Sequence, residues 1–185
     1  MEDPVKEISG VIHLLTQSPP SIQRTTLETY FTKNASFTHP FCRTGSFDNS
    51  RWYVWMVYRW YKIMSPRIEL EIKSVAFDEN TLQLYVQIFQ VFRIWIIPFH
   101  SSPVNLVTVL QLEYNKSLQK YLIRSQNDLY QVNEFVRFIW PGGYLFVLLW
   151  QFFSTLVCTI GALALWPVSW FEQHVLTNED QLYSS

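Results

Sequence analysis

The feature that most constrains this chain is a long stretch without charge near its C-terminal end. From Phe138 to Phe171 the sequence contains no Asp, Glu, Lys or Arg. Within this stretch, Leu145 to Leu165 reads LFVLLWQFFSTLVCTIGALAL, and about 20 apolar residues are enough for a helix to cross the hydrocarbon core of a bilayer. Tryptophan and tyrosine residues, whose rings favour the membrane–water interface, flank the segment. The stretch therefore predicts a single tilted transmembrane helix.

Two other interpretations of this segment stay open. A helix that is apolar on every side can be the core of a soluble protein, but the rest of the chain is too short to surround it. Two half-helices that turn near Gly161 would form a membrane hairpin, and no proline between Thr155 and Leu165 forces such a turn. We therefore expect one span and keep the hairpin as the alternative.

The charges on either side of the apolar segment indicate its orientation. Arg137 precedes the segment, whereas the residues after Phe171 carry acidic side chains and no Lys or Arg. Because positive charge favours the cytosolic side, we expect an integral membrane protein whose N-terminal domain faces the cytosol. This is the layout of a tail-anchored protein of the endoplasmic reticulum or another endomembrane. The expected parts are a soluble domain over 1–136, a hydrophobic membrane segment over 137–171 and a short acidic tail over 172–185.

Overall charge and cysteine content exclude several classes of function. The formal net charge is −1, so the chain has no basic field that could hold the phosphate backbone of a nucleic acid. Cys42 and Cys158 are the two cysteines, and neither belongs to a C-x-x-C motif or to a spacing typical of a metal site. We therefore expect no nucleic-acid partner, no metal site and no cofactor.

The first part of the chain has the periodicity of helices. Segments 4–17, 21–31 and 51–64 place apolar residues at helical spacing. A proline-containing SPPS separates the first two helices, and Asp48 or Ser50 can cap the third. Between the second and third helices, ASFTHP is a short extended piece, since the residue before Pro40 is biased away from helix.

From residue 67 onward the pattern changes to the alternation of strands. RIELEIKSVAF at 67–77 alternates charged and apolar side chains. Three further runs follow at 81–99, 104–114 and 120–132, separated by turn sequences. The predicted fold class is α+β, with a curved antiparallel sheet of about four long strands packed on three N-terminal helices. A transmembrane helix completes the chain.

This order of elements resembles the nuclear-transport-factor-two-like superfamily, a cone-shaped α+β fold that includes ketosteroid isomerase, scytalone dehydratase and SnoaL-type cyclases. LETYFTKNASFTHPF at 27–41 is similar to the second helix and first strand of that superfamily, and IRSQNDLYQV at 123–132 to its last strand. The resemblance covers about residues 4–135. With WPGGYLFVLLW at 140–150, the whole chain also resembles a group of fungal SigF-like proteins with a membrane tail. That group implies a fold but no defined activity.

The resemblance singles out two candidate catalytic residues. His39 stands where ketosteroid isomerases hold a catalytic carboxylate, and Asp128 matches a proton-transferring carboxylate of SnoaL-type cyclases. Because side chains alternate along an extended segment, His39 shares the side of Phe37 and should face the interior. The alternatives are structural: His39 can bond the backbone of the turn at 42–45, and Asp128 can cap a helix at 131–139.

Other residues are candidates for binding a ligand. Tyr30 can donate a hydrogen bond to a developing oxyanion, and Phe37 can line the pocket. Trp55 belongs to a mainly core stripe with Trp52 and Trp60, whose rings would also suit a flat apolar ligand. Arg93 either faces water at a sheet edge or pairs inside the pocket, where an unpaired charge would be costly. The apolar hairpin tip IWIIPF at 94–99 suits a core or dimer contact, or an interfacial foot on a membrane.

These observations lead to two functional hypotheses. The first is a membrane-anchored binding module for an apolar, lipid-like or sterol-like ligand or for a protein partner, with membrane lipid around it and a homodimer as a further option. The second is an isomerase, cyclase or dehydratase that uses His39 and Asp128 on an apolar substrate. We favour the binding module because the set of acid and base groups is incomplete. An enzyme requires both residues to face one cavity together with an oxyanion donor.

Overall fold

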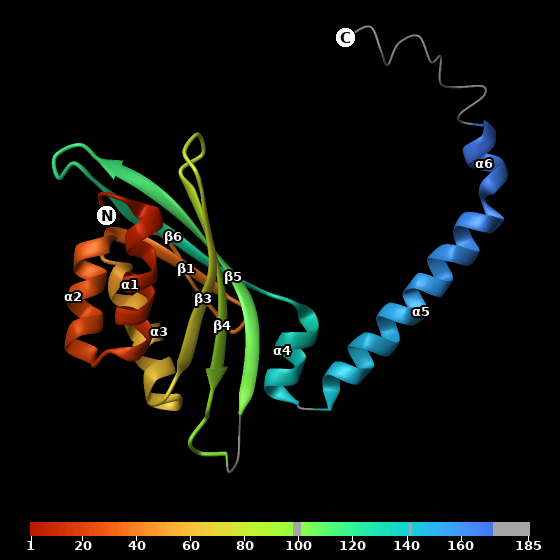
Figure 1. The fold of residues 1–185 in the computed structure, drawn as a ribbon, viewed down its shortest axis with the longest axis horizontal. Coiled ribbons are helices and arrows are strands. Elements are labelled where there is room, and N and C mark those ends of the chain that lie inside the picture. The colour runs from red at the N-terminus through yellow and green to blue at the C-terminus, as the bar shows by residue number, and fades with distance from the viewer. Residues whose placement is uncertain (98–100, 141, 172–185) are drawn as a thin grey trace, which may run out of the picture.

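The computed structural model describes residues 1–97, 101–140 and 142–171. The acidic tail expected over 172–185 and the last residues of the 94–99 hairpin tip lie outside the described residues. Three helices at the N-terminal end cover one face of a curved sheet, and a long helix extends away from the domain (Figure 1).

The helices begin and end close to where the sequence predicts them. They are α1 (Pro4–Gln17), α2 (Pro20–Tyr30) and α3 (Arg51–Met64). Asp3 precedes α1 and accepts a hydrogen bond from the backbone N–H of Lys6 at 3.2 Å, which satisfies one of the unpaired donors at a helix start. One side of α1 is buried against the sheet through its residues Ile8, Val11, Ile12 and Leu15.

The sheet has six strands, in the spatial order β2-β1-β6-β5-β4-β3. Their bounds are β1 (Phe31–His39), β2 (Cys42–Thr44), β3 (Glu69–Asp78), β4 (Gln83–Phe92), β5 (Ser102–Asn115) and β6 (Lys120–Tyr130). The four long antiparallel strands β3 to β6 and the α+β class are as predicted. The sheet curves without closing, as expected for the cone fold (Figure 1).

Three details of the sheet differ from the sequence prediction. The segment around ASFTHP is a strand of nine residues, β1, which pairs with β6 in parallel. The expected turn after Pro40 contains β2, which pairs with β1. The strand expected over 81–99 ends at Phe92. The length of β1 depends on pairing with β6, which is distant in the chain and which a local pattern does not specify, whereas β2 pairs with β1 across a short local turn.

Ser50 joins α3 to the sheet rather than capping the helix. It occupies the N-cap position of α3 but makes no capping hydrogen bond there. Its hydroxyl is fully buried and donates to the carbonyl of Ala35 in β1 at 2.7 Å. The start of α3 is therefore tied to the strand that ends in His39.

We expect Ser50→Ala to lower the free energy of unfolding by about 1–2 kcal/mol, because the buried Ala35 carbonyl loses its donor. Urea unfolding of the whole chain in dodecyl maltoside measures this change. Ser46→Ala is the matched control, since the Ser46 hydroxyl donates to the neighbouring carbonyl of Asn34 at an exposed site. Equal losses in the two variants would contradict a role for burial at Ser50.

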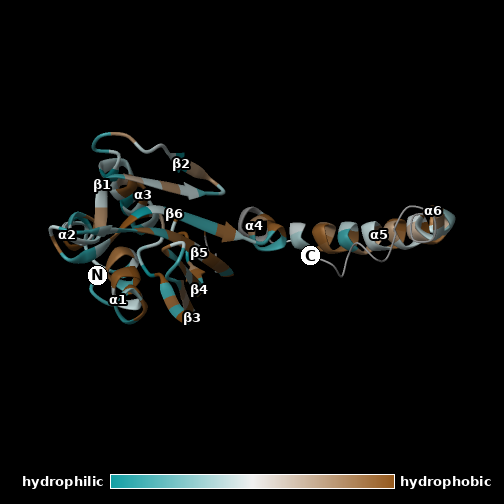
Figure 2. Cartoon of the chain, turned by 90° about the horizontal axis from the view of Figure 1, so that it is seen from above, coloured by the Kyte–Doolittle hydropathy of each residue, from teal (hydrophilic) through white to brown (hydrophobic). Residues whose placement is uncertain are grey.

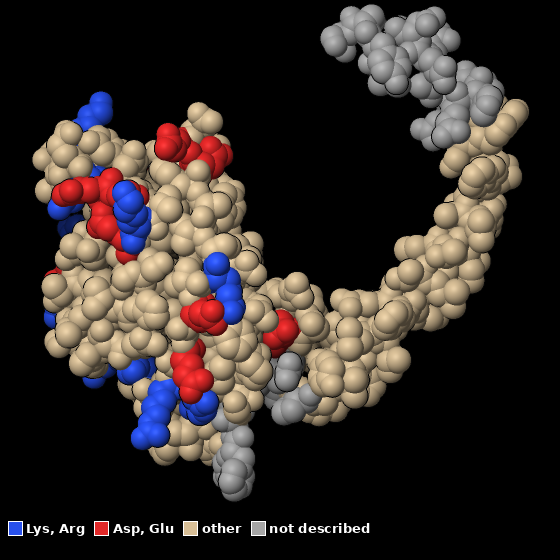
Figure 3. All heavy atoms as spheres, viewed as in Figure 1, with Lys and Arg blue, Asp and Glu red and all other residues tan. Residues whose placement is uncertain are grey.

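The C-terminal part consists of α4 (Val132–Ile139), α5 (Gly143–Ala164) and α6 (Trp166–Phe171). Of the helices in the described ranges, α5 is the one long and apolar enough to cross a membrane. It is one continuous helix, so the chain does not turn near Gly161. Its side chains stand away from the domain and carry no charge (Figures 2 and 3).

The joint between α4 and α5 is a tight turn. The Gly143 N–H donates to the Trp140 carbonyl at 2.8 Å. A Cβ at Gly143 would lie 2.6 Å from Val136 Cγ1 and 2.9 Å from Trp140 Cε3, so the turn as it stands has room for glycine alone.

Candidate functional site

The space between the helices and the inner face of the sheet holds two cavities that meet. The inner cavity measures about 50 Å³ and lies against α1 and the centre of the sheet. The outer cavity measures about 570 Å³ and lies between α3, the β1–β2 hairpin and α4. A ligand site for a small molecule usually spans roughly 300–1,000 Å³. The outer cavity therefore has the size of a ligand site, whereas the inner one has room for little more than water.

Four residues line both cavities and separate them: His39, Tyr61, Phe92 and Tyr130. The His39 ring meets the edge of Tyr130 with 4.9 Å between centroids and lies 5.4 Å from the ring of Tyr61. We call these four residues the aromatic gate. A ligand that goes from the outer to the inner cavity therefore passes these four side chains.

His39 ends β1 and is buried at the floor of the outer cavity. The Phe41 backbone N–H donates to His39 Nδ1 at 3.2 Å. Because Nδ1 accepts, the neutral ring carries its proton on Nε2. Nε2 has no hydrogen-bond partner within the described ranges. Burial lowers the pKa of His39 from 6.5 to about 4, so at neutral pH this ring is a neutral hydrogen-bond donor.

Asp128 lies on the inward side of β6, opposite Thr108 of β5. Its Oδ1 accepts from the Thr108 hydroxyl at 2.7 Å and from Gln126 Nε2 at 2.9 Å. Burial raises the pKa of Asp128 from 3.8 to about 6, although these two hydrogen bonds oppose the rise. The carboxylate lines the inner cavity, and among the described residues its Oδ2 has no protein donor.

Further polar side chains extend this cluster behind the gate. The Tyr58 hydroxyl, from α3, donates to Gln126 Oε1 at 2.7 Å. Gln90 Nε2, from β4, donates to the Tyr130 hydroxyl at 3.1 Å. Burial is the largest cause that raises the pKa of Tyr58 and of Tyr130, and the nearby Asp128 raises both further. Both phenols are therefore neutral donors at ordinary pH.

His39 and Asp128 line one inner cavity but make no direct hydrogen bond or ion pair in the described structure. Each has its own partners. His39 bonds the backbone of Phe41, one residue before the turn expected at 42–45. Asp128 does not cap the following helix: it bonds side chains within the sheet, and Gln131 is the N-cap residue of α4. The cap interpretation of Asp128 was therefore wrong.

The other candidate residues are divided between the site and the surface. Phe37 is buried and lines the inner cavity, whereas Tyr30 lines neither of the two cavities. Trp55 lines a separate pocket between α2 and α3, and its Nε1 donates to the Pro20 carbonyl at 3.3 Å. Arg93 pairs with Glu69 at 2.6 Å on the surface.

The tryptophan stripe on α3 is less buried than the sequence suggested. Trp52 is 52 % exposed and Trp60 is 58 % exposed, so the expectation that the stripe is mainly core was wrong for these two rings. The inward side of α3 instead carries Val54 and Tyr58, which are buried. Helical spacing alone selected the wrong side because both sides of α3 carry aromatic residues.

Sequence reasoning missed Gln126, Tyr130, Thr108 and Gln90 as site residues. A signal was present in β6, where Gln126, Asp128 and Tyr130 alternate and therefore share one side of the strand. For Thr108 and Gln90 the chain offered no local signal, since each lies within an apolar strand. Within the described ranges, no group of three or more His, Cys, Asp or Glu side chains could hold a metal ion.

Comparison with family models assigns the chain. The model described as the SigF NTF2-like domain matches residues 1–168. The chain belongs to this family. The match extends through α5, so the SigF NTF2-like family model includes the apolar helix as well as the cone. No curated protein sequence matches the chain.

Solved structures support the same fold at low sequence identity. A ketosteroid isomerase-like protein from Catenulispora acidiphila DSM 44928, in complex with trimethylamine, has a TM-score of 0.53 at 14 % identity and covers 69 % of this chain and 86 % of its own. SalBIII, an epoxide hydrolase/cyclase-like enzyme of pyran ring formation in salinomycin, has a TM-score of 0.51 at 15 % identity, covering 72 % and 97 %. AusH from Aspergillus nidulans has a TM-score of 0.51 at 9 % identity, covering 69 % and 82 %. At these identities the likeness concerns the fold alone.

Proposed function

We propose that this SigF NTF2-like protein is a membrane-anchored binding module that takes up an apolar molecule with one polar end. The observation that carries the proposal is the outer cavity of about 570 Å³, which is lined mainly by apolar side chains of α3, β1, β2 and α4. Apolar pockets with a few polar groups are typical of sites for small ligands. Phe37 lines the inner cavity, and its ring stacks on the His39 ring. Phe37 therefore positions His39 and does not itself contact a ligand in the outer cavity.

Polar groups at the gate set the chemistry of the polar end. His39 lines the outer cavity and its Nε2–H is a donor, whereas the Tyr130 hydroxyl bonds Gln90 on the side of the inner cavity. A hydroxyl or carbonyl oxygen at the end of an apolar body matches the His39 donor. Lipid-like and sterol-like molecules have this form, which favours them over fully apolar or charged ligands.

The bilayer is the natural source of such a ligand. In this proposal α5 spans the membrane as a tail anchor in the endoplasmic reticulum or another endomembrane, with the cone on the cytosolic side. The length and continuity of α5 and the exposure of most of its side chains support the anchor. An anchored cone remains within reach of membrane lipid, so the ligand does not need to cross water.

Narrowing the outer cavity tests the proposal. We expect Val57→Trp to weaken binding of a fluorescent sterol, dehydroergosterol, or of cis-parinaric acid by at least about tenfold, because Val57 lines the cavity and a larger ring would overlap the ligand. Binding is measured by fluorescence with the whole chain in dodecyl maltoside. Mass spectrometry of lipids that co-purify with the chain identifies the natural class.

Arg59→Trp is the matched control, because it adds the same ring to α3 outside the outer cavity and should leave binding unchanged. An equal loss of probe binding in both variants would show that the probe binds elsewhere on α3. A wild-type chain that binds neither probe and co-purifies with no lipid would refute the proposal.

A second candidate function is an isomerase, cyclase or dehydratase. Asp128 favours it, since a carboxyl with a pKa of about 6 is suited to act as a general base near neutral pH. His39 suits a donor role better than the base role, because its Nδ1 already accepts a hydrogen bond. We rank catalysis second because Asp128 lines the inner cavity but not the outer one, so the base lies behind the aromatic gate.

A further inference from the structure

Exposed apolar side chains form a surface at the end of the cone that lies lowest in Figure 1. The surface combines the C-terminal half of α3 with residues 94–97, which follow β4 (Figure 1). The Trp95 N–H donates to the Met64 carbonyl at 3.2 Å, and the Arg93 N–H donates to the Ser65 hydroxyl at 2.9 Å. We call this surface the apolar end and define it by its residues Trp60, Ile63, Trp95, Ile96 and Ile97.

All five side chains of the apolar end are 48–65 % exposed. Single exposed apolar residues are normal on a protein surface, but a contiguous group that includes two tryptophans marks an interaction site. Tryptophan in particular favours the boundary between lipid headgroups and hydrocarbon. The apolar end therefore requires an occupant that is apolar at its centre.

Basic side chains lie beside the apolar end. Figure 3 shows Lys and Arg at the lower end of the domain next to acidic side chains, and Glu69 pairs there with Arg93. Lys62 lies on the same half of α3, and Arg67 is exposed next to the strand that pairs with β4. The Arg67 backbone carbonyl accepts from the Ser65 hydroxyl at 3.4 Å, whereas its guanidinium has no ion pair or hydrogen bond in the part of the chain that the structure describes. Acidic Asp78 and Glu79 lie in the β3–β4 turn at the opposite end.

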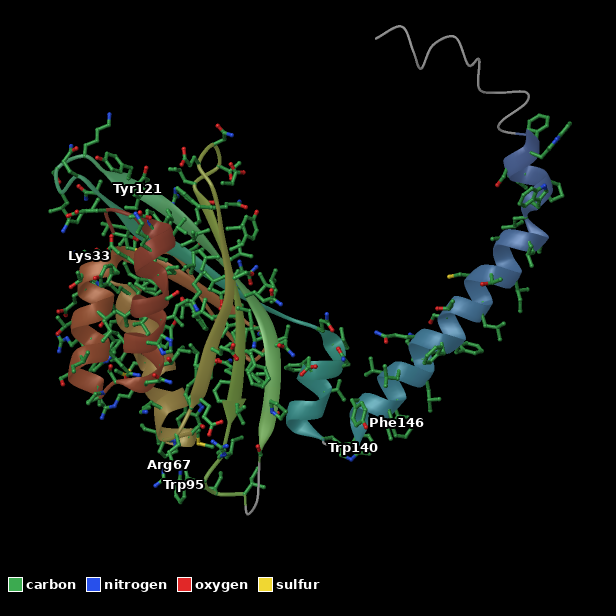
Figure 4. The ribbon with its side chains drawn as sticks, viewed as in Figure 1. Lys33, Arg67, Trp95, Tyr121, Trp140 and Phe146 are labelled. Carbon is green, nitrogen blue, oxygen red and sulfur yellow. The ribbon has the colours of Figure 1, made fainter. Side chains whose placement is uncertain are left out.

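The start of the apolar helix lies at this same end. Figure 4 shows Arg67 and Trp95 near each other at the lower end of the domain and Trp140 at a similar level below α4, and α5 begins three residues after Trp140. A ring at Trp140 and rings at the apolar end are thus placed to meet one membrane surface. The outer cavity also reaches this end, since Trp60 and Met64 line it.

We propose that the apolar end docks on the anionic surface of the membrane in which α5 is anchored, with Trp95 to Ile97 inserted among the headgroups. This inference rests on the proposed membrane anchor. Docking places the opening of the outer cavity at the level of the lipid, so a ligand passes from the bilayer into the cone along Trp60 and Met64. Lys62 and Arg67 contact headgroup phosphates.

Docking requires a rotation at the joint between α4 and α5. In the structure α5 runs back from Trp140 toward the level of the sheet (Figure 1). To cross the bilayer while the apolar end docks, α5 must rotate relative to α4. The short connection contains Gly142 next to Gly143, and glycine tolerates the backbone change that such a rotation needs.

Site-specific quenching by spin-labelled lipid tests the docking. Full-length chains with Cys42 and Cys158 replaced by serine carry one new cysteine, labelled with bimane, at Ile96, Glu79 or Leu156. They are reconstituted in vesicles of four parts phosphatidylcholine to one part phosphatidylserine that contain doxyl-labelled phospholipid. We expect quenching at Ile96 and at Leu156 in the middle of α5, and none at Glu79 in the far turn.

The three labelled positions distinguish a failure of the docking from a failure of the membrane anchor. Quenching at Leu156 without quenching at Ile96 would overturn the docking and leave the anchor in place. No quenching at either position would overturn both the anchor and the docking, while sterol binding in detergent would still decide the ligand proposal. Crosslinks between Ile96 cysteines of two chains, without lipid quenching, would assign the apolar end to a second copy and overturn the membrane as its occupant.

The dependence of docking on the charge of the lipid tests the proposal independently. We expect Arg67→Gln to lower the ratio of docked to free domain about fivefold in vesicles with phosphatidylserine, since a basic residue near an anionic surface has roughly that effect. In vesicles of phosphatidylcholine alone the change should vanish. Lys116→Gln, in the β5–β6 turn, is the control and should change neither ratio. Equal effects of Arg67→Gln in both lipids would contradict the proposed contact with headgroup charge.

Discussion

Asp128→Asn is expected to stabilise the protein by about 3 kcal/mol at pH 8 and to leave its stability nearly unchanged at pH 4. Asp128 has a pKa of about 6 in the folded protein against an ordinary value of 3.8, and one pKa unit corresponds to about 1.4 kcal/mol. The folded state therefore binds the proton more tightly than the unfolded state. The contribution of this group to stability is largest below pH 3.8, falls as the pH rises to about 6, and stays constant above that.

Asparagine removes the cost of a buried charge and keeps its partners. Its Oδ1 can still accept from Thr108 and from Gln126, which now bond Asp128 at 2.7 Å and 2.9 Å. Urea unfolding in dodecyl maltoside, whose charge does not change with pH, measures the difference from wild type. Asp48→Asn is the control at an exposed site and should stay within about 0.5 kcal/mol of wild type at both pH values. A loss of stability in Asp128→Asn at pH 8 would refute the assignment of a costly buried carboxylate.

The second large effect is expected from His39→Asn, with the opposite dependence on pH. The folded protein holds the pKa of His39 at about 4, against 6.5 for the free side chain. The unfolded state binds the proton more tightly, so the contribution of this group is constant above pH 6.5 and is lost as the pH falls toward 4. The unfolding free energy of His39→Asn minus that of wild type should therefore be about 3 kcal/mol larger at pH 4 than at pH 8.

Asparagine also preserves the local hydrogen bond at this position. Its side-chain oxygen lies near the place of Nδ1, which accepts from the Phe41 N–H at 3.2 Å in the native chain. His39→Gln places its oxygen elsewhere and serves as a second variant, expected to lose additional stability at every pH. If His39→Asn followed the wild-type pH curve in parallel, the imidazole would not be buried in its neutral form.

These two residues oppose each other in the same pH range. As the pH falls from 6.5 to 4, the His39 contribution is lost while the Asp128 contribution is gained. The wild-type curve should therefore be flatter than that of either variant. Since no hydrogen bond joins the two side chains in the described structure, the double variant should equal the sum of the single changes within about 0.5 kcal/mol. A larger coupling would support a shared acid–base pair and with it the enzyme hypothesis.

The aromatic gate explains why binding and catalysis are hard to separate from the fold alone. His39 and Tyr130 line both cavities, whereas Asp128 lines the inner cavity but not the outer one. A ligand held in the outer cavity meets the His39 donor but not the Asp128 carboxylate. Catalysis would need Tyr61 or Phe92 to move aside so that the substrate reaches the carboxylate, and a binding module needs no such movement.

Local periodicity was sufficient to predict most of the secondary structure. α1 and α3 have the predicted bounds, and β3, β5 and β6 differ from the prediction by a few residues at their ends. The uncharged stretch from Phe138 predicted α5, because length and composition alone decide whether a helix can cross a bilayer. The alternation of side chains along an extended segment also predicted that His39 lies on the same side of β1 as the buried Phe37. Each of these properties depends on neighbours within a few positions along the chain.

The arrangement around His39 and Asp128 was decided by the tertiary structure. Parallel pairing of β1 with β6 places Phe37 beside Gln126, and the β5–β6 register places Thr108 beside Asp128. No local pattern specifies these pairings, because they join segments that are about 90 and 20 residues apart. The exposure of Trp60 and the surface pairing of Arg93 followed from which side of each element the core covers. The chain alone thus determined the elements and the apolar helix, while packing decided which polar groups meet and how their burial shifts their protonation.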